Sequence, residues 1–121
     1  MASTKVKIPP PYEWQDQVTV IQYCTLNNIL CNHTPNEGKR SFAEGRKLKQ
    51  MGLSKGFPDI SILEPRGEFH GLYIEMKRRK GGRVSIEQKK AIIALRVQGY
   101  RVEVCEGWEK AREVIKEYME T

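Results

Sequence analysis

The chain has 121 residues, a length typical of one domain, and 39% of them are hydrophobic, which is enough for a compact core. No run of about 18 apolar residues occurs, so we expect no membrane-spanning helix, and the N-terminal MASTKVKIPP is too short and too polar for a secretory signal. The formal net charge of +6 favours polyanionic partners.

The N-terminal part of the chain contains a basic arm and then an amphipathic helix. Residues 1–11 are expected to form a flexible arm, and residues 12–121 are expected to form the folded domain. Three prolines lead into a helix over 12–26, where apolar residues recur at three- and four-residue spacing. The predicted apolar face of this helix consists of Trp14, Val18, Ile21 and Thr25.

The middle of the chain has the pattern of strands with one short helix between them. A short strand is expected at 29–33, and a short basic helix is expected over 41–52 because it starts with a capping box and ends at a glycine. Two further strands, at 59–63 and 70–77, are joined by turn residues that include Gly67 and therefore predict a hairpin.

The C-terminal third predicts a helix, a strand and a second helix. Ser85 and Gln88 form a capping box that starts a helix to about residue 98, and alternation predicts a strand over 100–106. The last helix is expected over 108–119. The order of elements predicts an α/β fold with a mixed sheet flanked by helices. Residues expected to be buried are Ile92, Ile93, Leu95 and Val97 in the first helix and Trp108, Ala111, Ile115 and Tyr118 in the second.

The predicted hairpin contains charged residues among its apolar positions. In GFPDISILEPRGEFHGLYIEMKRRK, Glu75 and Lys77 lie on one face of their strand because side chains alternate. If the turn is centred on Gly67, Asp59 lies directly opposite Glu75, with the Cβ atoms about 4.5–5.5 Å apart. The hairpin therefore brings two carboxylates and an ammonium group together.

Two carboxylates at this separation repel each other by about 3 kcal/mol at an effective dielectric constant near 20. A proton, a basic neighbour such as Lys77 or a divalent cation can offset this repulsion. Mg²⁺ takes oxygen ligands and is commonly held by one or two carboxylates together with substrate phosphate. The alternative interpretation is a salt-bridge ladder on a solvated face of the sheet.

Several short motifs resemble one known family. GFPD, IEMK and SIEQ, together with PNEGKR, GRKLKQMG and LRVQGYRVEVC, resemble the VRR-NUC branch of the PD-(D/E)xK nucleases. The resemblance covers roughly residues 12–108. It implies a single domain with the restriction-endonuclease-like fold, in which a mixed β-sheet is flanked by helices.

The resemblance also implies a set of active-site residues. It makes Asp59 and Glu75 ligands of Mg²⁺ or Mn²⁺ and Lys77 the catalytic lysine. The main-chain carbonyl of Met76 is implied as a further ligand, and Gln88 is expected to reach the site from its helix.

Family members also supply a glutamate from the first helix. Glu13 matches this position best, and Asp16 competes with it. A structural role is open as well, because the helix dipole favours an acid in a first helical turn.

The resemblance implies a metal-dependent DNA endonuclease, in particular a homodimer similar to a Holliday-junction resolvase that acts on branched DNA. Two alternatives stay open, a non-catalytic DNA-binding module with the same fold and a protein that acts on RNA. Phosphate contacts are expected from Lys47, Lys49, Lys55, Arg78, Arg79, Lys80, Arg83 and Lys89.

The remaining residues with distinctive chemistry are interpreted as structural. Cys24, Cys31 and Cys105 are widely spaced without a C-x-x-C pair, so neither a zinc site nor a disulfide framework is indicated, and we expect a cytoplasmic location. Trp14 and Trp108 are interpreted as core anchors rather than base-stacking platforms.

Overall fold

The computed structural model describes residues 11–34, 44, 46–47, 50–51 and 56–121. The predicted arm falls almost entirely outside these residues, as does much of the predicted helix 41–52. The elements are α1 Glu13–Leu26, β1 Cys31–His33, β2 Ile60–Ile62, β3 Leu72–Lys77, α3 Ile86–Val97, β4 Arg101–Glu106 and α4 Trp108–Met119. This order confirms the helices and strands predicted within the described residues.

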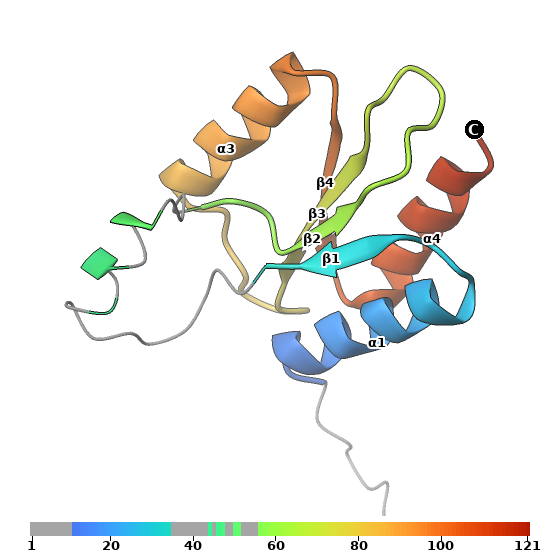
Figure 1. The fold of residues 1–121 in the computed structure, drawn as a ribbon. Coiled ribbons are helices and arrows are strands. Elements are labelled where there is room, and N and C mark those ends of the chain that lie inside the picture. Colours follow the sequence, from blue (N-terminus) through green and yellow to red (C-terminus); the bar gives the residue numbers. More distant parts are fainter. Residues whose placement is uncertain (1–10, 35–43, 45, 48–49, 52–55) are drawn as a thin grey trace, which may run out of the picture.

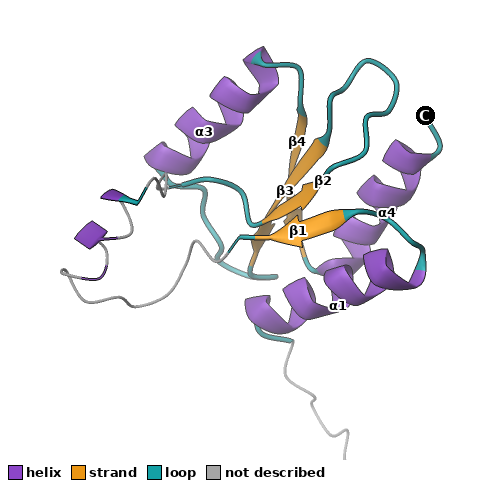
Figure 2. Cartoon of the chain, in the orientation of Figure 1, coloured by secondary structure: helices purple, strands orange, loops and turns teal. Residues whose placement is uncertain are grey.

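The four strands form one mixed sheet in the order β1-β2-β3-β4. β2 pairs antiparallel with both β1 and β3, and β4 pairs parallel with β3. A parallel neighbour requires a crossover, which α3 provides (Figure 2). The predicted mixed sheet flanked by helices is therefore confirmed.

The register between β2 and β3 is the one expected for a turn centred on Gly67. Ile60 pairs with Ile74, and Ile62 pairs with Leu72. Because the two strands are antiparallel, the residue before Ile60 faces the residue after Ile74. The register therefore sets Asp59 opposite Glu75.

Helices cover the two faces of the sheet unequally. α1 and α4 lie against one face, and α3 lies against the other (Figure 1). The face toward α1 and α4 carries the larger core, to which β2 and β3 contribute five buried side chains. The face toward α3 carries a smaller apolar cluster around Val102, so part of this face can hold polar groups. The five strand residues of the larger core are Ile60, Ile62, Leu72, Ile74 and Met76.

The predicted apolar face of α1 is largely wrong, although Ile21 packs against the core. The helix buries Asp16, Val20 and Cys24, whereas Trp14 is 60% exposed and Val18 is 46% exposed. The prediction failed because Asp16 occupies a core-facing position, where an arginine from a distant part of the chain neutralises it. Trp14 is therefore not a core anchor.

The predictions for the two later helices fared better. α4 buries Ala111, Ile115 and Tyr118 as expected, and Trp108 is half-buried against the core. In α3, the expected Gln88, Ile92 and Leu95 are buried. Ile93 and Val97 are exposed, because α3, the helix that covers this face in the described part of the chain, contacts the sheet along a narrow stripe. No helix in the described part of the chain has the length and apolar composition needed to cross a membrane.

A glycine brings the segment before β2 against the start of α3. Gly56 has a φ of 86°, and a Cβ atom there would lie 2.6 Å from the main-chain carbon of Glu87. Such a contact is possible only without a side chain. Gly56 therefore fixes the path by which the chain enters the segment that carries Asp59.

We predict that Gly56→Ala lowers the free energy of unfolding by about 2–4 kcal/mol, the sum of left-handed strain and a steric clash. Gly81→Ala is the matched control, because Gly81 has a φ of 75° but its nearest neighbouring atom would lie 4.0 Å from the new Cβ. Gly81→Ala should lower the free energy of unfolding only by the cost of the left-handed strain, about 1–2 kcal/mol. Urea denaturation measures both, and equal losses would contradict the close approach at Gly56.

Candidate active site

Asp59 is fixed where β1, β2 and β3 meet. It directly precedes β2 and is 1% exposed. Its Oδ2 accepts a hydrogen bond from the main-chain N–H of Met76 at 2.9 Å, and its main-chain carbonyl accepts one from Thr34 at 2.7 Å. The carboxylate is therefore held against β3 beside Glu75.

Glu75 and Lys77 lie on the α3 side of β3 and are buried with Asp59. Glu75 is 1% exposed and Lys77 is 7% exposed, and Lys77 Nζ lies 3.5 Å from Glu75 Oε1. Charged side chains are almost never fully buried unless they are paired or serve a site. The alternative of a solvated salt-bridge ladder is therefore wrong.

Gln88 joins the start of α3 to these buried charges. Its Oε1 accepts hydrogen bonds from Lys77 Nζ and from the main-chain N–H of Ser85, both at 2.8 Å, and its Nε2 donates to Glu75 Oε1 at 3.0 Å. In return, Ser85 Oγ accepts from the Gln88 main-chain N–H at 3.1 Å. The predicted capping box is confirmed, and the same amide bridges the lysine and the glutamate.

The structure thus brings together Asp59, Glu75, Lys77 and Gln88 as the sequence predicts, while their catalytic and metal-binding roles stay predictions. If all three charged groups are ionised, the cluster carries one negative charge in excess. Buried charge without compensation is costly, so a cation at this position would be strongly favoured.

The available donors fit a hard divalent cation. Asp59 and Glu75 offer carboxylate oxygens from facing positions, and the main-chain carbonyl of Met76 lies between the two site residues of β3. Mg²⁺ and Mn²⁺ prefer oxygen ligands and retain places for water or phosphate. These three residues would hold the ion, and the remaining ligands would come from water and substrate.

Glu13 is half-buried in the first turn of α1. Among the described residues, no three His, Cys, Asp or Glu side chains gather closely enough to hold a metal. The role of Glu13 as a ligand therefore stays a prediction.

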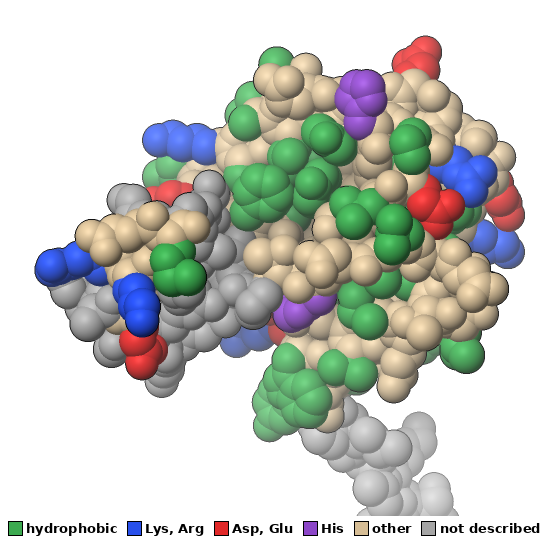
Figure 3. Space-filling view, viewed as in Figure 1, with side chains coloured by type: hydrophobic (Ala, Val, Ile, Leu, Met, Phe, Trp, Pro, Cys, Tyr) green, Lys and Arg blue, Asp and Glu red, His purple; other side chains and the backbone are tan. Residues whose placement is uncertain are grey.

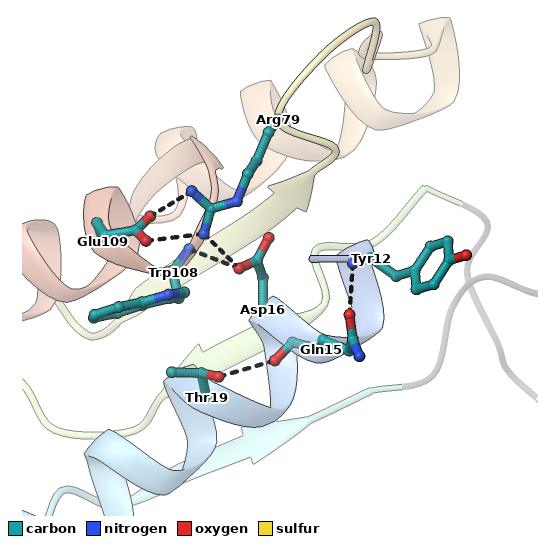
Figure 4. A network of polar contacts seen from close by, with 7 residues as sticks. All are labelled: Tyr12, Gln15, Asp16, Thr19, Arg79, Trp108 and Glu109. Carbon is teal, nitrogen blue, oxygen red and sulfur yellow. Dashed lines mark hydrogen bonds and ion pairs between the residues drawn. The ribbon is translucent and has the colours of Figure 1, made fainter. Parts of the chain in front are cut away.

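Asp16, the competitor of Glu13, belongs to a different network. Its Oδ1 lies 2.9 Å from Arg79 Nη2, which also donates to Glu109 Oε1 at 2.9 Å (Figure 4). Asp16 is fully buried, and its Oδ1 accepts a weaker hydrogen bond from the main-chain N–H of Trp108 at 3.4 Å. This network ties α1 and α4 to the segment directly after Lys77.

The network around Arg79 was not predicted from the sequence. Arg79 was expected to contact DNA, but its guanidinium is paired with two carboxylates, so the structure favours a structural role for it. Hydrogen bonds to Glu109 and Asp16 raise the pKa of Arg79 above its ordinary value. One sequence signal could have pointed to Asp16: it recurs at four-residue spacing with Val20 and Cys24, which are the buried residues of α1.

Exposed basic residues follow the candidate site along the chain. Arg78, Lys80 and Arg83 lie on the connection from β3 to α3, and Lys89 follows Gln88. All four are exposed, as is Lys47. The other two predicted phosphate contacts, Lys49 and Lys55, lie outside the described residues.

The Arg79–Glu109 pair generates a pH-dependent prediction. The hydrogen bond from Arg79 holds the pKa of the Glu109 carboxyl below its ordinary value of 4.5. Since the folded-state pKa is lowered, the pair stabilises the protein above pH 4.5 and loses this effect as the pH falls through the lowered pKa. The Glu109 side chain is 43% exposed, so its contribution should stay below about 1 kcal/mol.

We therefore expect Glu109→Gln to be less stable than the parent at pH 7 in urea denaturation, with a difference that shrinks below pH 4.5. Glu113→Gln, which removes the same charge at an exposed position on the same helix, is the control. A difference that persists unchanged at pH 3 would contradict the ion pair.

Comparison with known proteins agrees with the observed fold. The VRR-NUC domain matches residues 11–109. A solved structure described as a VRR_NUC domain protein is similar with a TM-score of 0.79 and 28% sequence identity, over 93% of this chain and 92% of that one. No curated protein matches the sequence. The chain belongs to the VRR-NUC domain family, a family of the nuclease type.

Proposed function

We propose that this chain is a divalent-metal-dependent endonuclease that hydrolyses phosphodiester bonds in branched DNA. The observation that carries the proposal is the burial of Asp59, Glu75 and Lys77 in one cluster with Gln88. A non-catalytic DNA-binding module would have little chemical reason to keep two acids and a lysine out of water at the end of a sheet.

The side chains have distinct tasks in this proposal. Asp59 and Glu75, with the Met76 carbonyl, would hold Mg²⁺ or Mn²⁺, which when bound supplies Lewis acidity for phosphodiester hydrolysis. Lys77 would orient the attacking water or stabilise negative charge in the transition state. Gln88 holds Lys77 Nζ at 2.8 Å and so limits its positions.

The exposed cations indicate how the substrate would be held. Arg78, Lys80, Arg83 and Lys89 are exposed and follow Lys77 along the chain, on either side of Gln88. Contacts from such side chains to phosphates carry no base information, so recognition would depend on the shape of the DNA.

We further propose a homodimer. One site of this kind cuts one strand, whereas resolving a four-way junction requires two nicks. A twofold axis supplies two equivalent sites, and twofold dimers are the commonest oligomers. Sedimentation at micromolar concentration distinguishes the dimer from a monomer.

We expect Asp59→Asn and Lys77→Met to slow cleavage of a labelled four-way junction at least about 100-fold in Mg²⁺ or Mn²⁺. Asparagine keeps an oxygen that can accept the hydrogen bond from Met76, so this change removes charge rather than structure. Lys116→Ala, at an exposed position on α4, is the control for lysine removal. Flap and linear duplex substrates, each with and without EDTA, define the structural preference and the need for metal.

Retained DNA binding by the two inactive variants, measured in EDTA, would separate loss of chemistry from loss of fold. Parental cleavage rates for either variant would contradict the active-site assignment.

We also predict that Arg83→Ala and Lys89→Ala weaken binding to junction and duplex alike. Removal of one cation that touches a phosphate should make the slope of log affinity against log salt concentration shallower by about 0.9. Fluorescence anisotropy over a series of salt concentrations measures the slope, with Lys116→Ala again as the control. A weakening confined to one base sequence would indicate base reading instead.

A further inference from the structure

An exposed groove lies between the outer face of α1 and the edge strand β1. Its volume is about 380 Å³, within the range of small-ligand pockets. Figure 3 shows hydrophobic side chains gathered in this region of the surface, near a histidine. The residues that line the groove are Trp14, Gln17, Val18, Ile21, Gln22 and His33.

Polar contacts tie both walls of the groove to segments that flank the candidate active site. The α1 wall is anchored through Asp16 to Arg79, two residues after Lys77. The β1 wall ends at His33, and the next residue, Thr34, donates its main-chain N–H to the carbonyl of Asp59 at 2.7 Å. A DNA strand that leaves the site around this edge of the sheet would therefore pass the groove.

The chemistry of the lining selects for a flat, uncharged ligand. Trp14 offers an indole ring that is 60% exposed, and most of the surface of the groove is apolar, although Gln17, Gln22 and His33 also line it. No Asp, Glu, Lys or Arg of the described residues lines the groove, so it does not favour a phosphate. A nucleobase is flat and uncharged, and it stacks well on an exposed aromatic ring.

We propose that this groove binds an unpaired nucleobase of the substrate, stacked on Trp14, next to the position of cleavage. The proposal rests on the proposed nuclease function and refines it, because a paired base inside a duplex cannot present its face to Trp14. The enzyme would thereby select branched or frayed DNA, in which bases near the cut are unpaired. A second copy of the chain is the alternative occupant, and we favour the base because both walls of the groove are tied to segments that flank the candidate site, through the Asp16–Arg79 ion pair and the hydrogen bond between Thr34 and Asp59.

The test uses the fact that the chain has only two tryptophans. In a Trp108→Phe background, Trp14 is the sole indole, and EDTA prevents cleavage. Titration with a single-stranded oligodeoxynucleotide should quench the fluorescence of Trp14, whereas a blunt hairpin duplex should leave it nearly unchanged.

Affinity provides a second readout that does not depend on the Trp108 variant. Trp14→Ala should weaken binding of the single strand about tenfold and leave duplex binding unchanged, and Trp14→Phe should restore most of the affinity. Phe69→Ala removes an exposed aromatic ring in the β2–β3 loop and is the control. It should change neither the affinity for the single strand nor the affinity for the duplex.

Single-strand binding that is unaffected by Trp14→Ala, in a protein that still cuts junctions, would overturn this inference and leave the proposed function intact. Two results together would assign the groove to a second copy of the chain and so also overturn the inference. They are a Trp14 fluorescence that changes with protein concentration in the absence of DNA, and a Trp14→Ala variant that is a monomer. Failure of the parent protein to bind any DNA would instead overturn the proposed function itself.

Discussion

The burial of three charged side chains at the ends of β2 and β3 is the constraint on which the rest of the structure depends. Asp59, Glu75 and Lys77 are each less than a tenth exposed. Removing charges from water costs free energy, and a folded protein tolerates this cost only when hydrogen bonds and opposite charges replace the water. The hydrogen bond from the Met76 N–H to Asp59 and the two contacts of Gln88 provide this replacement in part.

The same residues therefore serve both the fold and the site. Gln88 caps α3 through Ser85 and also holds Lys77, so the start of the helix cannot shift without moving the lysine. On the other face, Arg79 ties the end of β3 to α1 and α4 through Asp16 and Glu109. Anchors on both sides hold β3 at the point where its charged residues lie, which is the rigidity that a positioned catalytic group requires.

Local signals were enough to predict most of the fold and the position of Asp59 opposite Glu75, whereas the expectation that Gln88 reaches these residues came from the family resemblance. The register about Gly67 and the capping box at Ser85 depend on residues close in sequence, and the structure confirms both. The apolar face of α1 could not be predicted in this way. Asp16 resembles a solvated residue until its partner is known, and that partner lies 63 positions away. Trp14 was placed in the core because it recurs at helical spacing with Val18 and Ile21, although α1 faces the sheet mainly with Asp16, Val20 and Cys24.

The central claim is that Asp59 and Glu75 jointly hold a divalent cation. Diffraction data collected at the manganese absorption edge from crystals soaked in Mn²⁺ test it most directly. We expect an anomalous peak within coordination distance of both carboxylates and of the Met76 carbonyl. Crystals that bind Mn²⁺ elsewhere while this position shows no peak, with Asp59 and Glu75 in the positions described above, would contradict it.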